Sequence, residues 1–143
     1  MHLGIYSKLA RQDVIAAQEF VSQRGYTSSD ADIRRCRQDL AKLGDDINLK
    51  KVTRVADFYS VSACRDLLFH VQETQLTLPK ISAFLIENGL KFLGFDISGT
   101  VLQKFRRRFS DDKAVTDLKL WHLFETENPT TFIRMYQFWV QRE

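Results

Sequence analysis

The stretch Thr77–Ile97, TLPKISAFLIENGLKFLGFDI, indicates the fold class. Its first half predicts a helix that Thr77 caps, with Pro79 in the first turn, where a missing N–H is harmless. The predicted buried face of this helix is Ile81, Phe84 and Leu85. Asn88-Gly89 then ends the helix, and an apolar strand follows over residues 90–97. A helix, a glycine stop and an apolar strand are typical of an α/β unit rather than of a helical bundle.

Apolar residues at helical spacing predict two amphipathic helices before this stretch. The first runs from about Leu9 to Arg24 and ends at Gly25, which supplies a left-handed stop. The second runs over Asp30–Leu43 behind a Ser29 cap, with Gly44 as its stop. Residues 45–53 are polar and predict a connection. A short helix is then expected to begin at Ser60 or Ser62 and to continue through His70.

The two ends of the chain carry strand-like patterns. His2–Tyr6 is short and apolar at Leu3 and Ile5, and it reads as a buried strand with no turn before it. Two more helices are expected around Phe105 and Trp121. Residues 132–140 fit a helix by spacing, yet Tyr136-Gln137-Phe138-Trp139-Val140 is a dense run of β-formers. The pattern alone leaves helix and strand open there.

Composition excludes several classes of protein. The 143 residues are 44% hydrophobic and 27% charged, so the chain is expected to form one folded unit rather than a disordered one. The net charge of +3 comes from interleaved charges. Only Arg106-Arg107-Arg108 forms a basic run, so nucleic acid is not expected as a partner. No apolar stretch approaches a membrane span and no leader pattern opens the sequence, which predicts a cytoplasmic protein with no membrane partner.

Few residues suggest chemistry by their spacing. His70 lies four residues after Asp66, so a carboxylate could orient an imidazole base, although a half-exposed histidine near a helix end is the plainer interpretation. Cys64 is interpreted as a buried structural thiol, and Cys36 lies too far along the sequence to form a Cys-x-x-Cys motif with it. No set of metal ligands and no glycine-rich phosphate loop is present in the sequence. Catalytic residues therefore stay unassigned.

Several strings resemble the C-terminal part of bacterial class I S-adenosylmethionine-dependent methyltransferases, specifically the large ones associated with tetratricopeptide repeats. The longer strings are CRDLLFHVQE at Cys64–Glu73 and MYQFWVQ at Met135–Gln141. Shorter ones are LGIYS at Leu3–Ser7, FYS at Phe58–Ser60 and GLKFLGF at Gly89–Phe95. Together they span nearly the whole chain.

The resemblance implies an α/β, partial Rossmann-like methyltransferase fold that is rich in helix, with a small mixed sheet of about three strands. Residues 2–6 would be the fifth strand of the family's sheet, residues 90–97 the sixth, and residues 135–141 an antiparallel seventh. For the C-terminal segment, the resemblance therefore favours a strand over a helix. Residues 1–143 are expected to form a single unit, the C-terminal portion of a methyltransferase domain, with inserted helices at about residues 9–70.

The family binds its cofactor through a glycine-rich loop after the first strand and an acidic residue at the end of the second. This sequence contains neither element, so the resemblance implies a fragment without the cofactor-binding half. S-adenosylmethionine is the cofactor of the parent family, and none is expected to bind this chain alone. The chain is expected to be the substrate-side part and to be inactive alone. By analogy, the substrate side would be lined by Tyr6, Ser7, Tyr59, Arg65 and His70.

Two kinds of partner follow from these expectations. A first strand without its usual neighbour invites either self-association or pairing with the upstream methyltransferase half. The alternative function is a helix-rich protein-binding or regulatory module associated with a methyltransferase. In that case the helices over residues 9–43 and the aromatic C-terminus would present a surface to a protein substrate or a repeat-domain partner.

Overall fold

The structure is a computed structural model that describes residues 1–43, 47–69 and 74–143. The chain folds into two compact units. The first unit contains Met1–Ala10 and Thr74–Glu143, and the second contains Arg11–Glu73. The sequence predicts a single unit over residues 1–143 with inserted helices at about residues 9–70, and the second of the two units covers nearly the residues of those helices.

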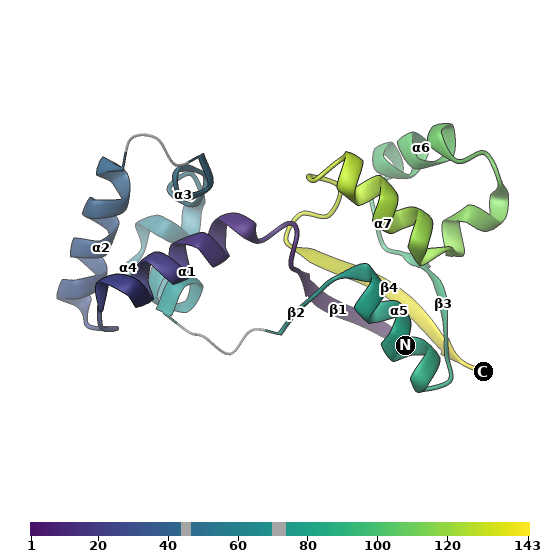
Figure 1. Ribbon diagram of the computed structural model, residues 1–143, viewed down its shortest axis with the longest axis horizontal. Helices are drawn as coiled ribbons and strands as arrows, with labels where there is room; N and C mark the ends of the chain where they lie inside the picture. The colour runs from purple at the N-terminus through teal and green to yellow at the C-terminus, as the bar shows by residue number, and fades with distance from the viewer. Residues whose placement is uncertain (44–46, 70–73) are drawn as a thin grey trace. The chain divides into compact units, whose positions relative to one another are not determined.

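The first unit is built on a four-stranded sheet in the order β2-β1-β4-β3 (Figure 1). Its strands are β1 (His2–Ser7), β2 (Gln75–Leu76), β3 (Leu90–Phe95) and β4 (Met135–Arg142). β4 lies between β1 and β3 and is antiparallel to both, whereas β2 pairs with β1 in parallel. The expected helix-rich α/β fold with a small mixed sheet is therefore confirmed, and β2 is a fourth strand that the sequence did not indicate.

Helices of the first unit pack on one face of this sheet. They are α5 (Leu78–Glu87), α6 (Gly99–Arg108) and α7 (Leu118–Glu127), with the 3₁₀ turn η3 at Asp112–Thr116. Along β4, Tyr136, Phe138 and Val140 are buried among residues of these helices, while Gln137 and Trp139 are exposed. Burial at every second residue is the signature of a strand with one covered face, so the terminal segment is a strand and not a helix.

The second unit is helical. It contains α1 (Gln12–Arg24), α2 (Asp30–Lys42), α3 (Ile47–Val52), α4 (Val61–Cys64), the 3₁₀ turn η1 (Ala56–Tyr59) and the π-helical turn η2 (Arg65–Phe69). Gly25 adopts the left-handed conformation at φ 69° and ends α1, as predicted. Ser29 caps α2 by accepting the backbone N–H of Asp32 at 3.2 Å, also as predicted.

Three local expectations differ from the structure. The polar pattern of residues 45–53 predicts a connection, but α3 forms there because Leu49 and Val52 enter the core of the second unit. The spacing places Phe84 on the buried face of α5, but Phe84 is 46% exposed, and Leu78 fills the third buried position instead. Thr77 does precede α5, yet its side chain accepts no capping hydrogen bond. The predicted stop at Gly44 lies outside the described residues.

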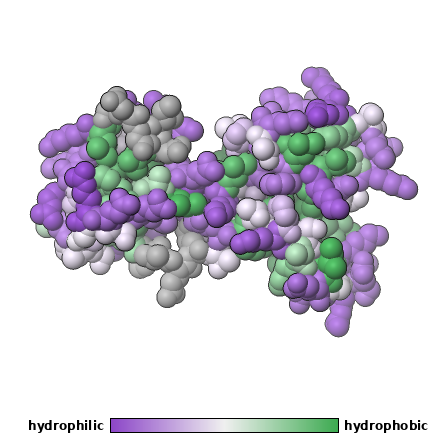
Figure 2. Space-filling model, viewed as in Figure 1, coloured by the Kyte–Doolittle hydropathy of each residue, from purple (hydrophilic) through white to green (hydrophobic). Residues whose placement is uncertain are grey.

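Both units have a hydrophilic surface with local apolar exceptions. Figure 2 shows hydrophobic residues gathered over α5 and α7. Phe84 and Ile86 on α5 and Leu123 on α7 are large side chains that are at least 44% exposed. Among the described helices, none is both long enough and apolar enough to cross a membrane.

Candidate functional site

The first unit contains a buried polar cluster where β1 ends. Ser7 is the last residue of β1, Tyr136 belongs to β4, and Glu125 lies on α7. All three are at most 1% exposed. The hydroxyl of Ser7 donates to Glu125 Oε1 at 2.9 Å, and the hydroxyl of Tyr136 donates to Oε1 at 2.7 Å and to Oε2 at 2.9 Å. We call Ser7, Glu125 and Tyr136 the Glu125 cluster.

Local sequence explains how each member reaches this position. Ser7 follows the inward-facing Leu3 and Ile5 at a spacing of two, so its side chain points to the same face of β1. Tyr136 is the first of the three buried residues of β4. Glu125 follows Leu118 and Trp121 at helical spacing and shares their buried side of α7. The cluster thus joins the carboxyl end of β1 to α7 and β4.

The electrostatics of the cluster oppose the charged form of the carboxyl group. Burial raises the pKa of Glu125 above its ordinary value, because it removes water from the carboxylate. The hydroxyls of Tyr136 and Ser7 act in the other direction and lower this pKa, since both donate hydrogen bonds to the carboxylate. Burial also raises the pKa of the Tyr136 phenol. The cluster can therefore hold a proton on Glu125 above the ordinary glutamate range.

Ser7 is the one predicted site residue that belongs to this cluster. Its hydroxyl also accepts a hydrogen bond from the backbone N–H of Ala10 at 3.1 Å, so this hydroxyl acts both as a donor and as an acceptor. Tyr6, its neighbour on β1, is half-buried. The carboxyl end of β1 is thus a polar position within the first unit.

The other predicted site residues belong to the second unit. Tyr59 is 65% exposed, and its ring stands edge-on to Phe58 with centroids 5.6 Å apart. Arg65 donates from Nε to the carbonyl oxygen of Ser28 at 3.0 Å and forms an ion pair with Asp30. These contacts fasten the start of α2 to η2, which is a structural role. His70 lies outside the described residues.

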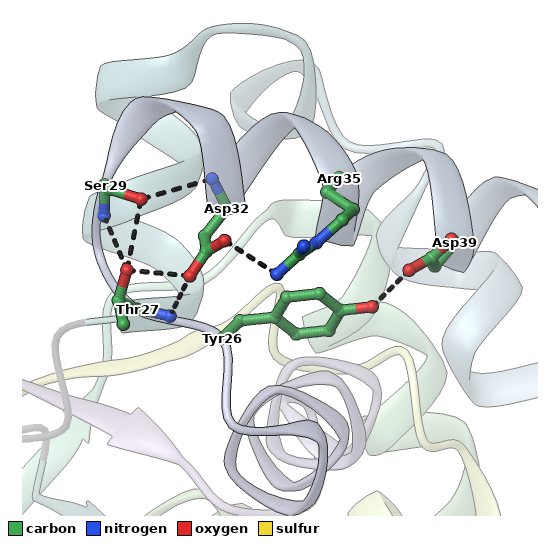
Figure 3. Close-up of polar contacts among 6 residues, drawn as sticks. All are labelled: Tyr26, Thr27, Ser29, Asp32, Arg35 and Asp39. Carbon is green, nitrogen blue, oxygen red and sulfur yellow. Dashed lines mark hydrogen bonds and ion pairs between the residues drawn. The ribbon is translucent and has the colours of Figure 1, made fainter.

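A second polar cluster in that unit surrounds the start of α2 (Figure 3). Asp32 accepts hydrogen bonds from the backbone N–H and the hydroxyl of Thr27 at 2.8 and 2.7 Å, and from Arg35 at 2.8 Å. The Thr27 backbone N–H is the main reason that the pKa of Asp32 is lowered. The hydroxyl of Tyr26 donates to Asp39, and this bond raises the pKa of the Tyr26 phenol. The arrangement resembles a capping box and orders the turn between α1 and α2.

The cysteines and possible metal ligands offer no further chemistry in the described residues. Cys36 and Cys64 are both free thiols in the core of the second unit, as the sequence indicated for Cys64. Burial raises the pKa of Cys36 to about 12 and also raises that of Cys64, so neither forms a thiolate at neutral pH. Within the described ranges, no group of three or more His, Cys, Asp or Glu side chains could hold a metal ion.

Sequence reasoning missed two members of the Glu125 cluster. Glu125 is an acid on an otherwise apolar helix side, seven residues after Leu118 and four after Trp121. A carboxyl group at such a position must find hydrogen-bond donors, and this signal was available in the sequence. The sequence indicates Tyr136 only as a β-former. Its partnership with Glu125 depends on how β4 packs against α7.

No protein-family model matches the chain, and a search of curated proteins found no matching relative.

Proposed function

We propose that this chain is the C-terminal, substrate-side part of a class I S-adenosylmethionine-dependent methyltransferase, with a Rossmann-like relation and a cytoplasmic location. The observation that carries the proposal is the strand arrangement: β4 is antiparallel to β1 and β3, and those two run parallel to each other. This is the direction pattern that the resemblance implies for the family's fifth, sixth and seventh strands. It supports the proposal independently of the matching strings.

The carboxyl end of β1 is the part of the first unit that the proposal assigns to the substrate. In open α/β sheets, ligands bind beyond the carboxyl ends of the parallel strands. Tyr6 and Ser7 occupy that end of β1. Because Ser7 is fully buried and held by Glu125, Tyr6 is the residue proposed to contact a methyl acceptor, and the Glu125 cluster is proposed to position the strand end.

The residues present do not fit the cofactor. A class I site needs a glycine-rich turn between a strand and a helix, so that backbone N–H groups can approach the ligand. Of the described glycines, Gly94 lies at the irregularity in β3 and Gly99 stands alone at the start of α6. In this proposal, the chain by itself therefore contributes no methyl-transfer step.

Calorimetric titration of the chain with S-adenosylmethionine tests the cofactor part of the proposal. We expect no binding heat. Micromolar binding would contradict the absence of a cofactor site, because a half-site lacking the glycine-rich turn has no cradle for the ligand.

Chemical-shift mapping tests the substrate part. The probes are a panel of small phenols, carboxylic acids and amines, which carry the groups that methyltransferases modify. We expect shifts at Tyr6 and its neighbours, and a loss of these shifts in Tyr6→Ala. Tyr59→Ala is the comparison variant, because the resemblance also assigns this exposed tyrosine of the other unit to the substrate side. Chemical-shift changes that do not include Tyr6 and its neighbours contradict the assignment of Tyr6 to the substrate.

The second candidate function is a protein-binding or regulatory module associated with a methyltransferase. The observation that favours it is the exposure of Phe84, Ile86 and Leu123 on α5 and α7. Large apolar side chains that remain exposed are candidates for a contact with a partner. In the same mapping experiment with a purified tetratricopeptide-repeat domain, shifts on α5 and α7 would favour the module.

A further inference from the structure

One edge of β1 has a partner along only part of its length. On one side, β1 pairs with β4 from His2 through Tyr6. On the other side, β2 pairs only with Tyr6 and Ser7, which are opposite Gln75 and Leu76. Within the described residues, the segment His2–Ile5 therefore has no strand on the side away from β4. We call this segment the open edge.

The hydrogen bonds to β4 show which backbone groups face the open edge. Met1 exchanges two bonds with Val140, at 2.8 and 2.9 Å, and the N–H of Ser7 donates to Arg134 at 2.9 Å. In an antiparallel pair, the residues that bond to the partner alternate along the strand. Met1, Leu3, Ile5 and Ser7 consequently direct their N–H and C=O groups to β4. His2 and Gly4 direct theirs to the open edge.

Within the described residues of the first unit, the open edge lacks the usual features that protect an edge strand. Proteins commonly block edges with lysine, proline, a bulge or a covering loop. His2–Ile5 contains no acidic residue, lysine or proline, and its pairing with β4 is regular. The His2 ring lies against Trp139 with centroids 4.8 Å apart, and Gly4 has no side chain. His2 and Gly4 are both exposed, so within the first unit their four backbone groups can be reached by another strand.

We propose that the open edge pairs with the same edge of a second copy of this chain, antiparallel about a two-fold axis at Leu3. In this register, His2 of each copy lies opposite Gly4 of the other, and each pair exchanges two hydrogen bonds. Tyr6 and Ser7 already pair with β2, so they take no part in the pairing between the two copies. The edge is uncharged apart from His2 and presents equal numbers of donors and acceptors, so it complements itself. This inference does not depend on the proposed function.

Light scattering of the purified chain measures the association. We expect the mass to rise with concentration from 16.7 kDa to twice that value and to stop there, because two-fold pairing closes on itself. Gly4→Pro removes an N–H that faces the open edge and is expected to abolish the dimer. Gly4→Ala is the matched control: its Cβ meets the flexible end of Met135 at 3.1 Å just as the proline Cβ does, but it keeps the N–H. The alanine variant should still dimerise.

Amide hydrogen exchange keeps the proposal testable even if Gly4→Pro fails to fold. The amides of His2 and Gly4 are expected to exchange slowly in concentrated solution and quickly in dilute solution. The amides of Leu3 and Ile5 bond to β4 and should be slow in both. A chain that remains monomeric at high concentration overturns the proposal. A dimer in which His2 and Gly4 stay unprotected, or an assembly that grows beyond two copies, overturns it equally.

Discussion

At Glu125, burial and hydrogen bonding act in opposite directions on one carboxyl group. Burial has the larger effect and raises the pKa in the folded state above the ordinary value of 4.5. A group whose pKa is raised on folding stabilises the protein fully below its unfolded pKa, and this contribution is lost as pH rises through the folded pKa. Glu125 is thus a source of pH-dependent stability whose sign is opposite to that of an ordinary paired carboxylate.

We predict that Glu125→Gln removes this pH dependence. Relative to the wild type, the free energy of unfolding of the variant should increase as pH rises above the ordinary glutamate value. Urea unfolding of both proteins between about pH 4 and pH 8 measures the difference. Glu87→Gln, which removes an exposed carboxyl group on α5, is the control for the loss of one carboxyl group. A difference that is constant over this range contradicts the prediction.

The hydroxyl of Tyr136 is predicted to stabilise the fold through Glu125. Tyr136→Phe leaves the buried carboxyl group with one donor fewer and should cost about 1–3 kcal/mol in the free energy of unfolding. It should also raise the pKa of Glu125 further, since the lost bond lowers that pKa. In a variant that already carries Glu125→Leu, Tyr136→Phe should lower the free energy of unfolding by much less. Equal costs in the two backgrounds would show that the hydroxyl acts independently of Glu125.

At the scale of single elements, α2 depends on its first turn. Ser29→Ala removes the hydroxyl that accepts the Asp32 N–H, and the expected cost is about 1 kcal/mol in the free energy of unfolding. Ser28→Ala is the matched control. It changes the neighbouring exposed serine, which accepts the hydrogen bond of Arg65 through its backbone carbonyl and not through its side chain. Comparing the urea midpoints of the two variants tests the cap, and a similar loss in both counts against it.

β4 offers a second test at this scale. Phe138 is fully buried and its neighbour Trp139 is 50% exposed on the opposite face. Phe138→Ala is expected to cost about 3–5 kcal/mol because it leaves a cavity in the core. Trp139→Ala should cost about 1 kcal/mol or less, since it removes mainly the contact with His2. Thermal unfolding of both variants measures the contrast, and comparable losses would argue against a one-sided strand.

These elements also explain how far the sequence could predict the fold. The Ser29 cap and the Gly25 stop involve neighbouring residues, so local chemistry sufficed for α1 and α2. β4 was ambiguous, because burial of every second residue becomes apparent only when the helices cover one face. α3 is hard to predict because its two buried residues, Leu49 and Val52, lie among charged and polar residues. The Glu125 cluster was missed because Ser7 lies 118 residues from Glu125 in the sequence.

At the scale of the whole molecule, the two units have separate hydrophobic cores. Every residue of one core cluster belongs to the range Val14–Phe69, and every residue of the other belongs to residues 3–5 or 76–140. In the described part of the chain, the two clusters share no residue. Because burial of apolar surface is the main source of stability, a cavity in one core should weaken the unit that contains it far more than the other.

We therefore predict that Ile33→Ala destabilises one unit selectively. Ile33 is 0% exposed in the core of the second unit, so the substitution should cost that unit about 2–5 kcal/mol. Native-state hydrogen exchange should show faster exchange of the slow amides in α1 and α2 and unchanged exchange in β4. Phe138→Ala should give the reverse pattern, because its cavity lies in the first unit. If either cavity accelerates the slow amides of both units by the same factor, the chain unfolds as one cooperative body, and its separate cores do not confer separate stabilities.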